Sequence, residues 1–287
     1  MTREDRIEIF KQTVDIVLHQ GCYLNEEGYK VFLSEYHSSQ MLTDFRSSKI
    51  KVDYTVLPDY DESISVINID CLELAKDLVD ERNHVAVLNM ASFAKPGGGV
   101  LNGSGAQEES LFRRTNLFTS LYQYHEIGSQ FGIPLKCDGQ YPLDMNYGVI
   151  FTPNVCVFRD SEENGCRFLE KPFLVDIISA AAIKNPTLDS SGKIVSNQVS
   201  ILKNKIRAIF DIALLHDVDT LVLSAFGCGA YKTPPGEMAR IFHEVIKEPE
   251  YDNKFKGLYF AIINDSNTHM GHNIHGNYTP FAEEFNC

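Results

Sequence analysis

The sequence has no long hydrophobic run. Its apolar stretches, such as "DTLVLSAFG" at 219–227, are far shorter than the roughly 20 residues that a membrane-spanning helix needs. The opening residues, "MTREDRIEIFKQ", are charged and contain no apolar core, so we expect no signal peptide. These shortages predict a cytoplasmic protein that does not enter a membrane.

The sequence also lacks paired cysteines and a recognisable metal-binding pattern. Seven cysteines, an odd number with no CxxC spacing, are typical of reduced thiols in the cytosol. The segment "HMGHNIH" offers His269, His272 and His275, but no well-spaced acid or cysteine completes a zinc site. We therefore predict a polar loop there and no metal centre.

Positive charge is scarce. The chain has 26 lysines and arginines against 39 aspartates and glutamates, a net charge of −13. Because a protein this acidic repels a polyanion along its length, we expect no direct binding to nucleic acid. It can still hold one anionic group in a local pocket of backbone N–H donors. The substrate should therefore be small, or the end of something large.

The 287 residues suffice for one large domain with an extension. Apolar residues at spacings of three and four predict a helix over residues 3–20. The following segment, 25–40, carries mixed signals. We interpret residues 1–50 as a helical extension packed on the core, and residues 51–287 as the main domain.

From residue 63 onwards, predicted strands and helices alternate. Strands are predicted at 63–70, 84–90, 172–183, 219–227 and 256–265, with a pair of strands in 148–160. Helices are predicted at 71–81, 107–124, 197–216 and 235–248. This alternation predicts an α/β fold with a mainly parallel sheet covered by helices on both faces. Ligands of such sheets bind at the carboxyl ends of the strands.

The first glycine-rich loop, "PGGGVLNGSGAQEE", follows the predicted strand at 84–90. Gly97, Gly98 and Gly99 let the backbone pass close to a ligand and take positive φ. No Gly-Lys-Ser/Thr follows and no G-x-G-x-x-G opens the helix, so this is neither a P-loop nor a dinucleotide fingerprint. The alternative is a flexible surface loop.

The second glycine-rich loop, "SAFGCGAYKTPPGEM", follows the predicted strand at 219–227. Gly227 and Gly229, on either side of Cys228, can direct N–H groups at a diphosphate together with the next helix N-terminus. Tyr231 could stack on a ribose or base, or belong to the core.

Two adjacent acids, Glu108 and Glu109, begin the helix after the first loop. Neighbouring helical positions lie about 100° apart around the axis, so the two cannot point the same way. The usual glycosidase pair, flanking a bond across roughly 5–9.5 Å, does not suit them. One acid transferring protons beside another that positions a sugar fits better. Alternatively, both acids only favour the helix dipole, by ~0.3–1 kcal/mol.

The pattern GGG, seven residues, then QEE resembles the signature of poly(ADP-ribose) glycohydrolases, which are catalytic macrodomains. The surrounding "LNMASFAKPGGGVLNGSGAQEE" resembles the microbial type, and the similarity extends along nearly the whole chain to the closing "GNYTPFAEEF". The resemblance implies a three-layer α/β/α macrodomain with a mixed, mainly parallel sheet and an N-terminal helical extension.

The resemblance also implies roles for individual residues. Glu109 would be the catalytic acid, Glu108 would hold the ribose beside the scissile bond, and Gln107 would support the pair. The remaining substrate-binding residues would be Asn89, Gly97, Gly98, Gly99 and Val100 at the distal ribose and diphosphate, Gly227, Cys228, Gly229 and Ala230 at the diphosphate, and Tyr231 over the ribose. Ser92 stands where some relatives carry an asparagine. For the adenine, residues 152–160 are a candidate segment.

The implied reaction is hydrolysis of the ribose–ribose O-glycosidic bond of poly(ADP-ribose), from the free end, releasing ADP-ribose. The substrate would be poly(ADP-ribose) or an ADP-ribosylated protein, no metal or organic cofactor would be needed, and we expect a monomer. Two alternatives stay open: a hydrolase of single ADP-ribose units on a protein side chain or nucleobase, and a macrodomain that binds ADP-ribose without cleaving it. The intact QEE argues against the second, because a reader does not need the acid.

Overall fold

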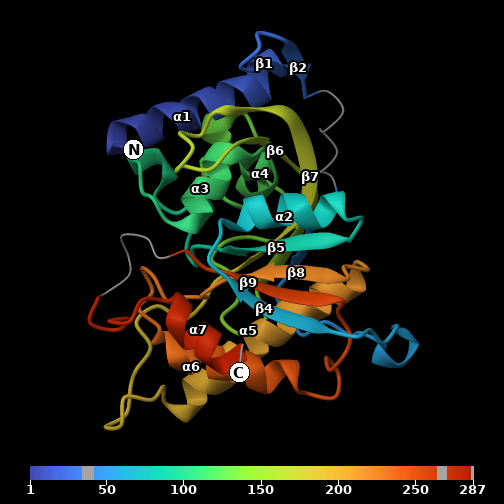
Figure 1. The fold of residues 1–287 in the computed structure, drawn as a ribbon. Helices are drawn as coiled ribbons and strands as arrows, with labels where there is room; N and C mark the ends of the chain where they lie inside the picture. Colours follow the sequence, from blue (N-terminus) through green and yellow to red (C-terminus); the bar gives the residue numbers. More distant parts are fainter. Residues whose placement is uncertain (34–41, 264–269, 286–287) are drawn as a thin grey trace.

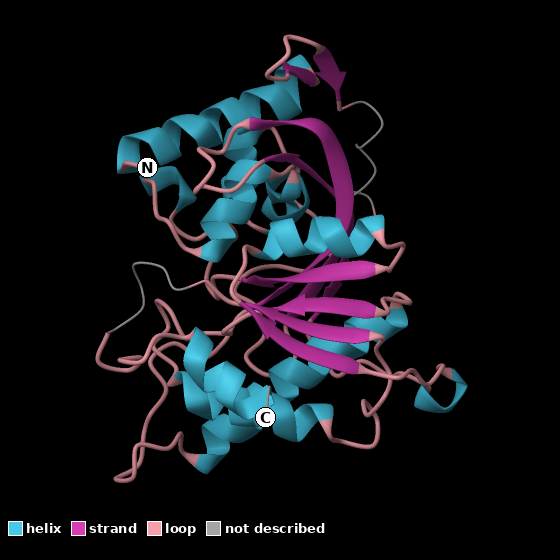
Figure 2. Ribbon diagram, in the orientation of Figure 1, coloured by secondary structure: helices cyan, strands magenta, loops and turns pink. Residues whose placement is uncertain are grey.

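A seven-stranded sheet runs through the middle of the molecule, in the order β3-β6-β7-β5-β8-β9-β4 (Figures 1 and 2). The computed structural model describes residues 1–33, 42–263 and 270–285. The five strands from β7 to β4 are parallel, whereas β6 is antiparallel to β7 and β3. The strands of this sheet are β3 (Asp44–Arg46), β4 (Ser63–Ile67), β5 (Val85–Met90), β6 (Val149–Arg159), β7 (Phe168–Ala180), β8 (Thr220–Leu223) and β9 (Gly257–Ala261).

Helices cover both faces of the sheet, as Figure 1 shows: α1 to α4 lie on one side, and α5 to α7 on the other. The helices are α1 (Arg3–Asp15), α2 (Cys71–Asp80), α3 (Gln107–Arg114), α4 (Leu117–Leu121), α5 (Ser196–Leu215), α6 (Pro235–Ile246) and α7 (Tyr278–Phe285). The predicted three-layer α/β/α macrodomain with a mixed, mainly parallel sheet is confirmed. No helix in the described ranges is both long and apolar enough to span a bilayer.

The central strand β5 is covered on both faces, and its sequence is accordingly a continuous apolar run. Ala86 and Leu88 pack into the layer with α5 and α6, whereas Val85 and Val87 face the layer of α2, α3 and α4. A strand covered on both faces needs apolar residues at every position, so alternation disappears. β5 is flanked by β7 and β8, and its carboxyl end therefore opens in the middle of the sheet.

The N-terminal helix begins with a capping box. The Thr2 hydroxyl accepts from the Asp5 N–H, and the Asp5 carboxylate accepts from the Thr2 N–H. The helix runs into a π-helical turn, η1 (Ile16–Gln20), and stops at Gly21, which is left-handed. A hairpin of β1 (Cys22–Leu24) and β2 (Lys30–Phe32) follows, and β2 lies in the segment with mixed sequence signals, 25–40. The domain boundary at residue 50 stays a prediction; β3, which precedes it, already pairs with β6.

One predicted helix is wrong: residues 107–124 do not form a single helix. α3 ends at Arg114 because Thr115 is extended, at φ −140° and ψ 173°, and bridges to Val157 on β6. The Asn116 Oδ1 then accepts from the Cys156 N–H. These bonds to a distant strand break the helix, and the chain continues as α4 and a 3-10 turn, η5 (Tyr122–Tyr124).

The predicted pair of strands at 148–160 is also wrong. This segment is one strand, β6, with an irregularity between Thr152 and Val155 in its pairing with β7. Asn154 there has φ +52°, and its N–H donates to Asp176 at 2.7 Å instead of to the ladder. The bulge interrupts the pairing locally within one continuous strand.

Candidate functional site

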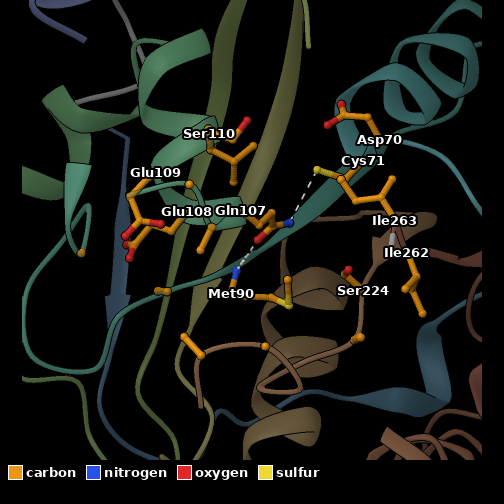
Figure 3. Close-up of a pocket in the computed structure, with 18 of the residues that line it drawn as sticks. Asp70, Cys71, Met90, Gln107, Glu108, Glu109, Ser110, Ser224, Ile262 and Ile263 are labelled. Atoms are coloured by element: carbon orange, nitrogen blue, oxygen red, sulfur yellow. Dashed lines mark hydrogen bonds between the residues drawn. The ribbon is translucent and has the colours of Figure 1, made fainter. Parts of the chain in front are cut away.

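A cavity of about 1150 Å³ lies at the carboxyl ends of the parallel strands. β5 and β8 are hydrogen-bonded neighbours, so the glycine-rich loops that follow them lie side by side. Both loops line the cavity, as does the first turn of α3 (Figure 3).

The backbone of the first loop holds the two acids of α3. Glu108 accepts from the N–H groups of Ser92, at 2.8 Å, and Gly97, at 3.0 Å. Glu109 accepts from the Gly99 N–H through Oε1, at 2.8 Å. Both carboxyl groups are buried, with exposed fractions of 3% and 7%. The loop therefore positions both acids before any ligand arrives.

Gly98 allows this contact. Its φ is +49°, in the left-handed region that side chains rarely adopt. A Cβ atom there would stand 2.6 Å from the Glu109 Oε1 and 3.2 Å from the Glu108 Oε2. Only a glycine lets the chain pass directly against both carboxylates.

The two acids differ in their hydrogen bonding. Burial raises the pKa of Glu108 to about 8, with a smaller contribution from the neighbouring Glu109, against the lowering effect of the Ser92 and Gly97 N–H donors. Burial therefore favours the protonated form of Glu108. The Glu109 Oε2 is buried and has no hydrogen-bond partner among the described residues. The described residues therefore supply no hydrogen-bond donor that would compete with a substrate for that oxygen.

Gln107 fastens the start of α3 to β5. Its Oε1 accepts from the Met90 N–H at 2.8 Å, and its Nε2 donates to the Leu88 carbonyl at 2.7 Å. A second contact joins Nε2 to the Cys71 Sγ at 3.5 Å; Figure 3 shows how Gln107 lies between Met90 and Cys71. Gln107 thus supports the adjacent acids through the backbone of the sheet.

The second loop forms the opposite wall. Gly227 has φ +77°, and a Cβ there would lie 2.7 Å from the Ala182 Cβ. Tyr231 lines the cavity, and its hydroxyl accepts from the Phe93 N–H at 2.8 Å. This tyrosine therefore connects the second loop to the first.

The structure brings most of the predicted site residues together around the cavity, and places four behind its wall. The lining residues are Ser92, Gly98, Gly99, Gln107, Glu108, Glu109, Gly227, Gly229, Ala230 and Tyr231. The residues behind the wall are Asn89, Gly97, Val100 and Cys228. Asn89, on β5, is fully buried and donates to the Ser179 Oγ of β7 at 3.0 Å, so its side chain joins these two strands.

Sequence reasoning missed the far end of the cavity. Asn68 to Cys71, after β4, and Ile262 and Ile263, after β9, line it there. Figure 3 shows Asp70 and Ile263 at the opposite end from Glu109. The signal was available, because each segment follows the carboxyl end of a parallel strand. The candidate adenine segment, 152–160, does not line the cavity.

Asp70 also fixes the local architecture. Its Oδ1 caps α2 by accepting from the Leu72 and Glu73 N–H groups, and the carboxylate accepts from the Arg114 Nη1 at 2.9 Å. Arg114 is 2% exposed, so this ion pair joins the start of α2 to the end of α3. Of the three histidines in "HMGHNIH", His269 lies outside the described residues. Within the described ranges, no group of three His, Cys, Asp or Glu could hold a metal ion.

The sequence profile of the family described as "Microbial-type PARG, catalytic domain" matches residues 11–160, just over half of the chain. This chain belongs to the microbial-type poly(ADP-ribose) glycohydrolase (PARG) family. Members of the PARG family are glycohydrolases. No curated protein matches the sequence.

Solved structures agree with this assignment. The crystal structure of PARG from Thermomonospora curvata bound to the inhibitor ADP-HPD is 26% identical, with a TM-score of 0.79, over 98% of this chain and 100% of that one. A crystal structure of PARG from Deinococcus radiodurans in complex with ADP-ribose has a TM-score of 0.67 and 22% identity, over 89% of this chain and 99% of that one. The second likeness shows the shared fold.

Proposed function

We propose that this PARG-family protein hydrolyses the ribose–ribose O-glycosidic bond of poly(ADP-ribose), with Glu109 as the acid. One observation carries the assignment of the acid: Glu109 is a buried carboxyl group in the cavity whose Oε2 has no partner among the described residues. A T. curvata relative binds the inhibitor ADP-HPD, and a D. radiodurans relative binds ADP-ribose, which supports ADP-ribose as the unit recognised here.

In the proposed reaction, Glu109 gives its proton to the oxygen of the departing ribose as the bond from C1″ to that oxygen breaks. An oxocarbenium-like centre forms, and water adds to C1″ while losing a proton to Glu109. One ADP-ribose leaves with the former water oxygen, the remaining polymer ends in a hydroxyl, and Glu109 is again protonated. This cycle balances without any other reactant.

The neighbouring residues bind and orient. Because burial raises its pKa, Glu108 in its protonated form can donate a hydrogen bond to a ribose hydroxyl as well as accept one. The N–H groups of Gly229 and Ala230, on the second loop, are suited to the diphosphate. The cavity end at Asp70 and Ile263 then takes the adenosine part of the same unit.

We further propose that attack begins at the free end of the polymer and that the protein acts as a cytoplasmic monomer. A net charge of −13 disfavours gripping an anionic chain through its middle. A cavity of about 1150 Å³ has room for one ADP-ribose unit, so a terminal unit satisfies it.

Replacing the acid tests the proposed function. Glu109→Gln should lower the turnover of poly(ADP-ribose) by at least about 10²–10⁴-fold, because both proton transfers are lost. Its affinity for ADP-ribose, measured by calorimetry, should stay within a few-fold of the wild type. Glu170→Gln, a matched change on an exposed part of β7, should leave both values unchanged. More than a tenth of the wild-type rate in Glu109→Gln would sink the assignment.

A further inference from the structure

The cavity also reaches α1 near Glu109, whose charge acts on Arg6. Arg6, from α1, and Ser161, Glu162 and Glu163, from the connection between β6 and β7, line this part. None of these residues falls within the 11–160 match to the family profile. The mechanism described above uses none of them.

Two glycines of the first loop lie directly against α1. A Cβ on Gly103 would lie 2.4 Å from the Arg3 carbonyl oxygen, and a Cβ on Gly105 would lie 2.6 Å from the Arg6 Cζ. Because neither glycine has a side chain, α1 can pack directly on the loop that leads into Glu108 and Glu109. The N-terminal helix is thereby a wall of the active site.

The Arg6 guanidinium is held in one orientation. Its Nε and Nη2 donate to the Glu162 carboxylate at distances of 2.6–3.1 Å. Glu162 also accepts from the Nη2 of Arg113, at 3.3 Å, and Arg113 is fully buried one turn after Glu109 on α3. Arg113 in turn donates from Nη1 to the Ser104 carbonyl at 2.8 Å. These contacts tie α1, α3 and the β6–β7 connection together around Arg6.

The cluster of Arg6, Glu162 and Arg113 carries two positive charges and one negative charge, and the nearby Glu109 also attracts both arginines. Two guanidinium groups share a single carboxylate, and the Arg6 Nη1 donates no hydrogen bond to another described residue. Arg6 is only about a quarter exposed, in a protein whose net charge is −13. A fixed, partly desolvated guanidinium with a free donor edge is suited to a phosphate, whose oxygens it can meet in pairs.

We propose that Arg6, oriented by Glu162, binds the diphosphate of the leaving group, the ADP-ribose unit that stays on the polymer. The proposal rests on the proposed function, because only a ribose–ribose linkage puts a nucleotide diphosphate on this side of Glu109. The exposed Glu163 on the same rim opposes further phosphates. The subsite therefore accepts one diphosphate and favours the polymer over a neutral leaving group.

The test compares two substrates: long poly(ADP-ribose), and ADP-ribose whose C1″ carries a small neutral aryl ether. Arg6→Gln should lower kcat/KM on the polymer by about tenfold or more, because a charge-assisted hydrogen bond is lost. On the neutral ether it should stay within twofold of the wild type, as should the affinity for free ADP-ribose. Lys11→Gln removes the same charge from an exposed position of α1 and should change neither. Arg6→Lys should recover part of the polymer activity.

A second variant keeps the test independent of α1 packing. Glu163→Gln, at an exposed position, should raise kcat/KM on the polymer by about two- to fivefold at low ionic strength, and leave the neutral ether unchanged. An equal loss on both substrates in Arg6→Gln would make Arg6 a packing residue and overturn the proposal. An unchanged polymer rate in both variants would overturn it too. A wild-type protein that cleaves neither substrate would instead contradict the proposed function.

Discussion

At the scale of single residues, adjacent and chemically identical acids acquire different environments. Glu108 has both oxygens occupied by backbone N–H groups of the first loop, and Glu109 has one oxygen occupied and one without a partner among the described residues. The difference follows from their directions on α3, which lie about 100° apart. This difference supports Glu109, the acid with the unoccupied oxygen, as the acid of the proposed reaction.

The raised pKa of Glu108 makes stability depend on pH. The folded protein keeps the Glu108 proton up to about pH 8, whereas the unfolded chain loses it near the ordinary value of 4.5. Between these values the folded state binds more protons, so stability falls as the pH rises, by up to about 1.4 kcal/mol per pH unit. Glu108→Gln, which stays neutral, removes this dependence.

We therefore expect the Glu108→Gln variant to gain on the wild type as the pH rises. At pH 5 it should be less stable by about 1–3 kcal/mol, because the amide loses an acceptor for the Ser92 or Gly97 N–H. By pH 8 the gap should close or reverse, as measured by urea unfolding at a series of pH values. A gap that stays constant from pH 5 to pH 8 would show that Glu108 is ionised throughout.

At the scale of elements, the first loop and α3 act as one unit. The loop binds both acids through its N–H groups, and Gln107 fastens the same turn of α3 to β5. The three glycines therefore do more than approach a ligand. They set the geometry of the acids.

Gly98→Val should damage this unit in two ways. The branched side chain would clash with the Glu109 Oε1. The valine backbone would also have to adopt φ +49°. We expect a loss of about 1–3 kcal/mol in the free energy of unfolding and a fall of at least about tenfold in ADP-ribose affinity. Gly236→Ala, in α6 with open space around the new Cβ, is the control and should lower neither the stability nor the affinity. Normal ADP-ribose binding by a folded Gly98→Val would refute the loop as the ligand cradle.

At the scale of the whole molecule, charge and cavity size bear on the mode of attack. A surface with a net charge of −13 repels each phosphate outside the pocket, and the cavity of about 1150 Å³ suits one unit. In the proposed leaving-group subsite, Arg6 adds a cationic contact for one further diphosphate. These features favour removal of units one at a time.

Early time points on size-resolved long polymer should accordingly show ADP-ribose and a slowly shortening chain, without free oligomers of intermediate length. The last protein-bound unit should persist, since its linkage to a side chain is not ribose–ribose. Abundant free oligomers would mean internal cleavage. Loss of the protein-bound unit would favour the hydrolase of single ADP-ribose units.

The sequence by itself determined the features that depend on local patterns. β5, β8 and α6 are bounded by turn residues and carry an apolar pattern that repeats along a few residues, so their type and order could be read. The GGG-x7-QEE spacing likewise lies within one loop and one helical turn. The family and the position of the two glycine loops followed from these local signals.

Only the tertiary structure decided what depends on distant partners. Thr115 breaks α3 because its backbone pairs with Val157, 42 positions further on, and no pattern near Thr115 records that partner. The environment of Glu108 and the approach of Arg6 to the cavity likewise depend on segments that meet only when the sheet forms. Long-range contacts set burial, and burial in turn sets the pKa of a carboxyl group and the strength of an ion pair. Those are the quantities that turn a pair of adjacent acids into an active site.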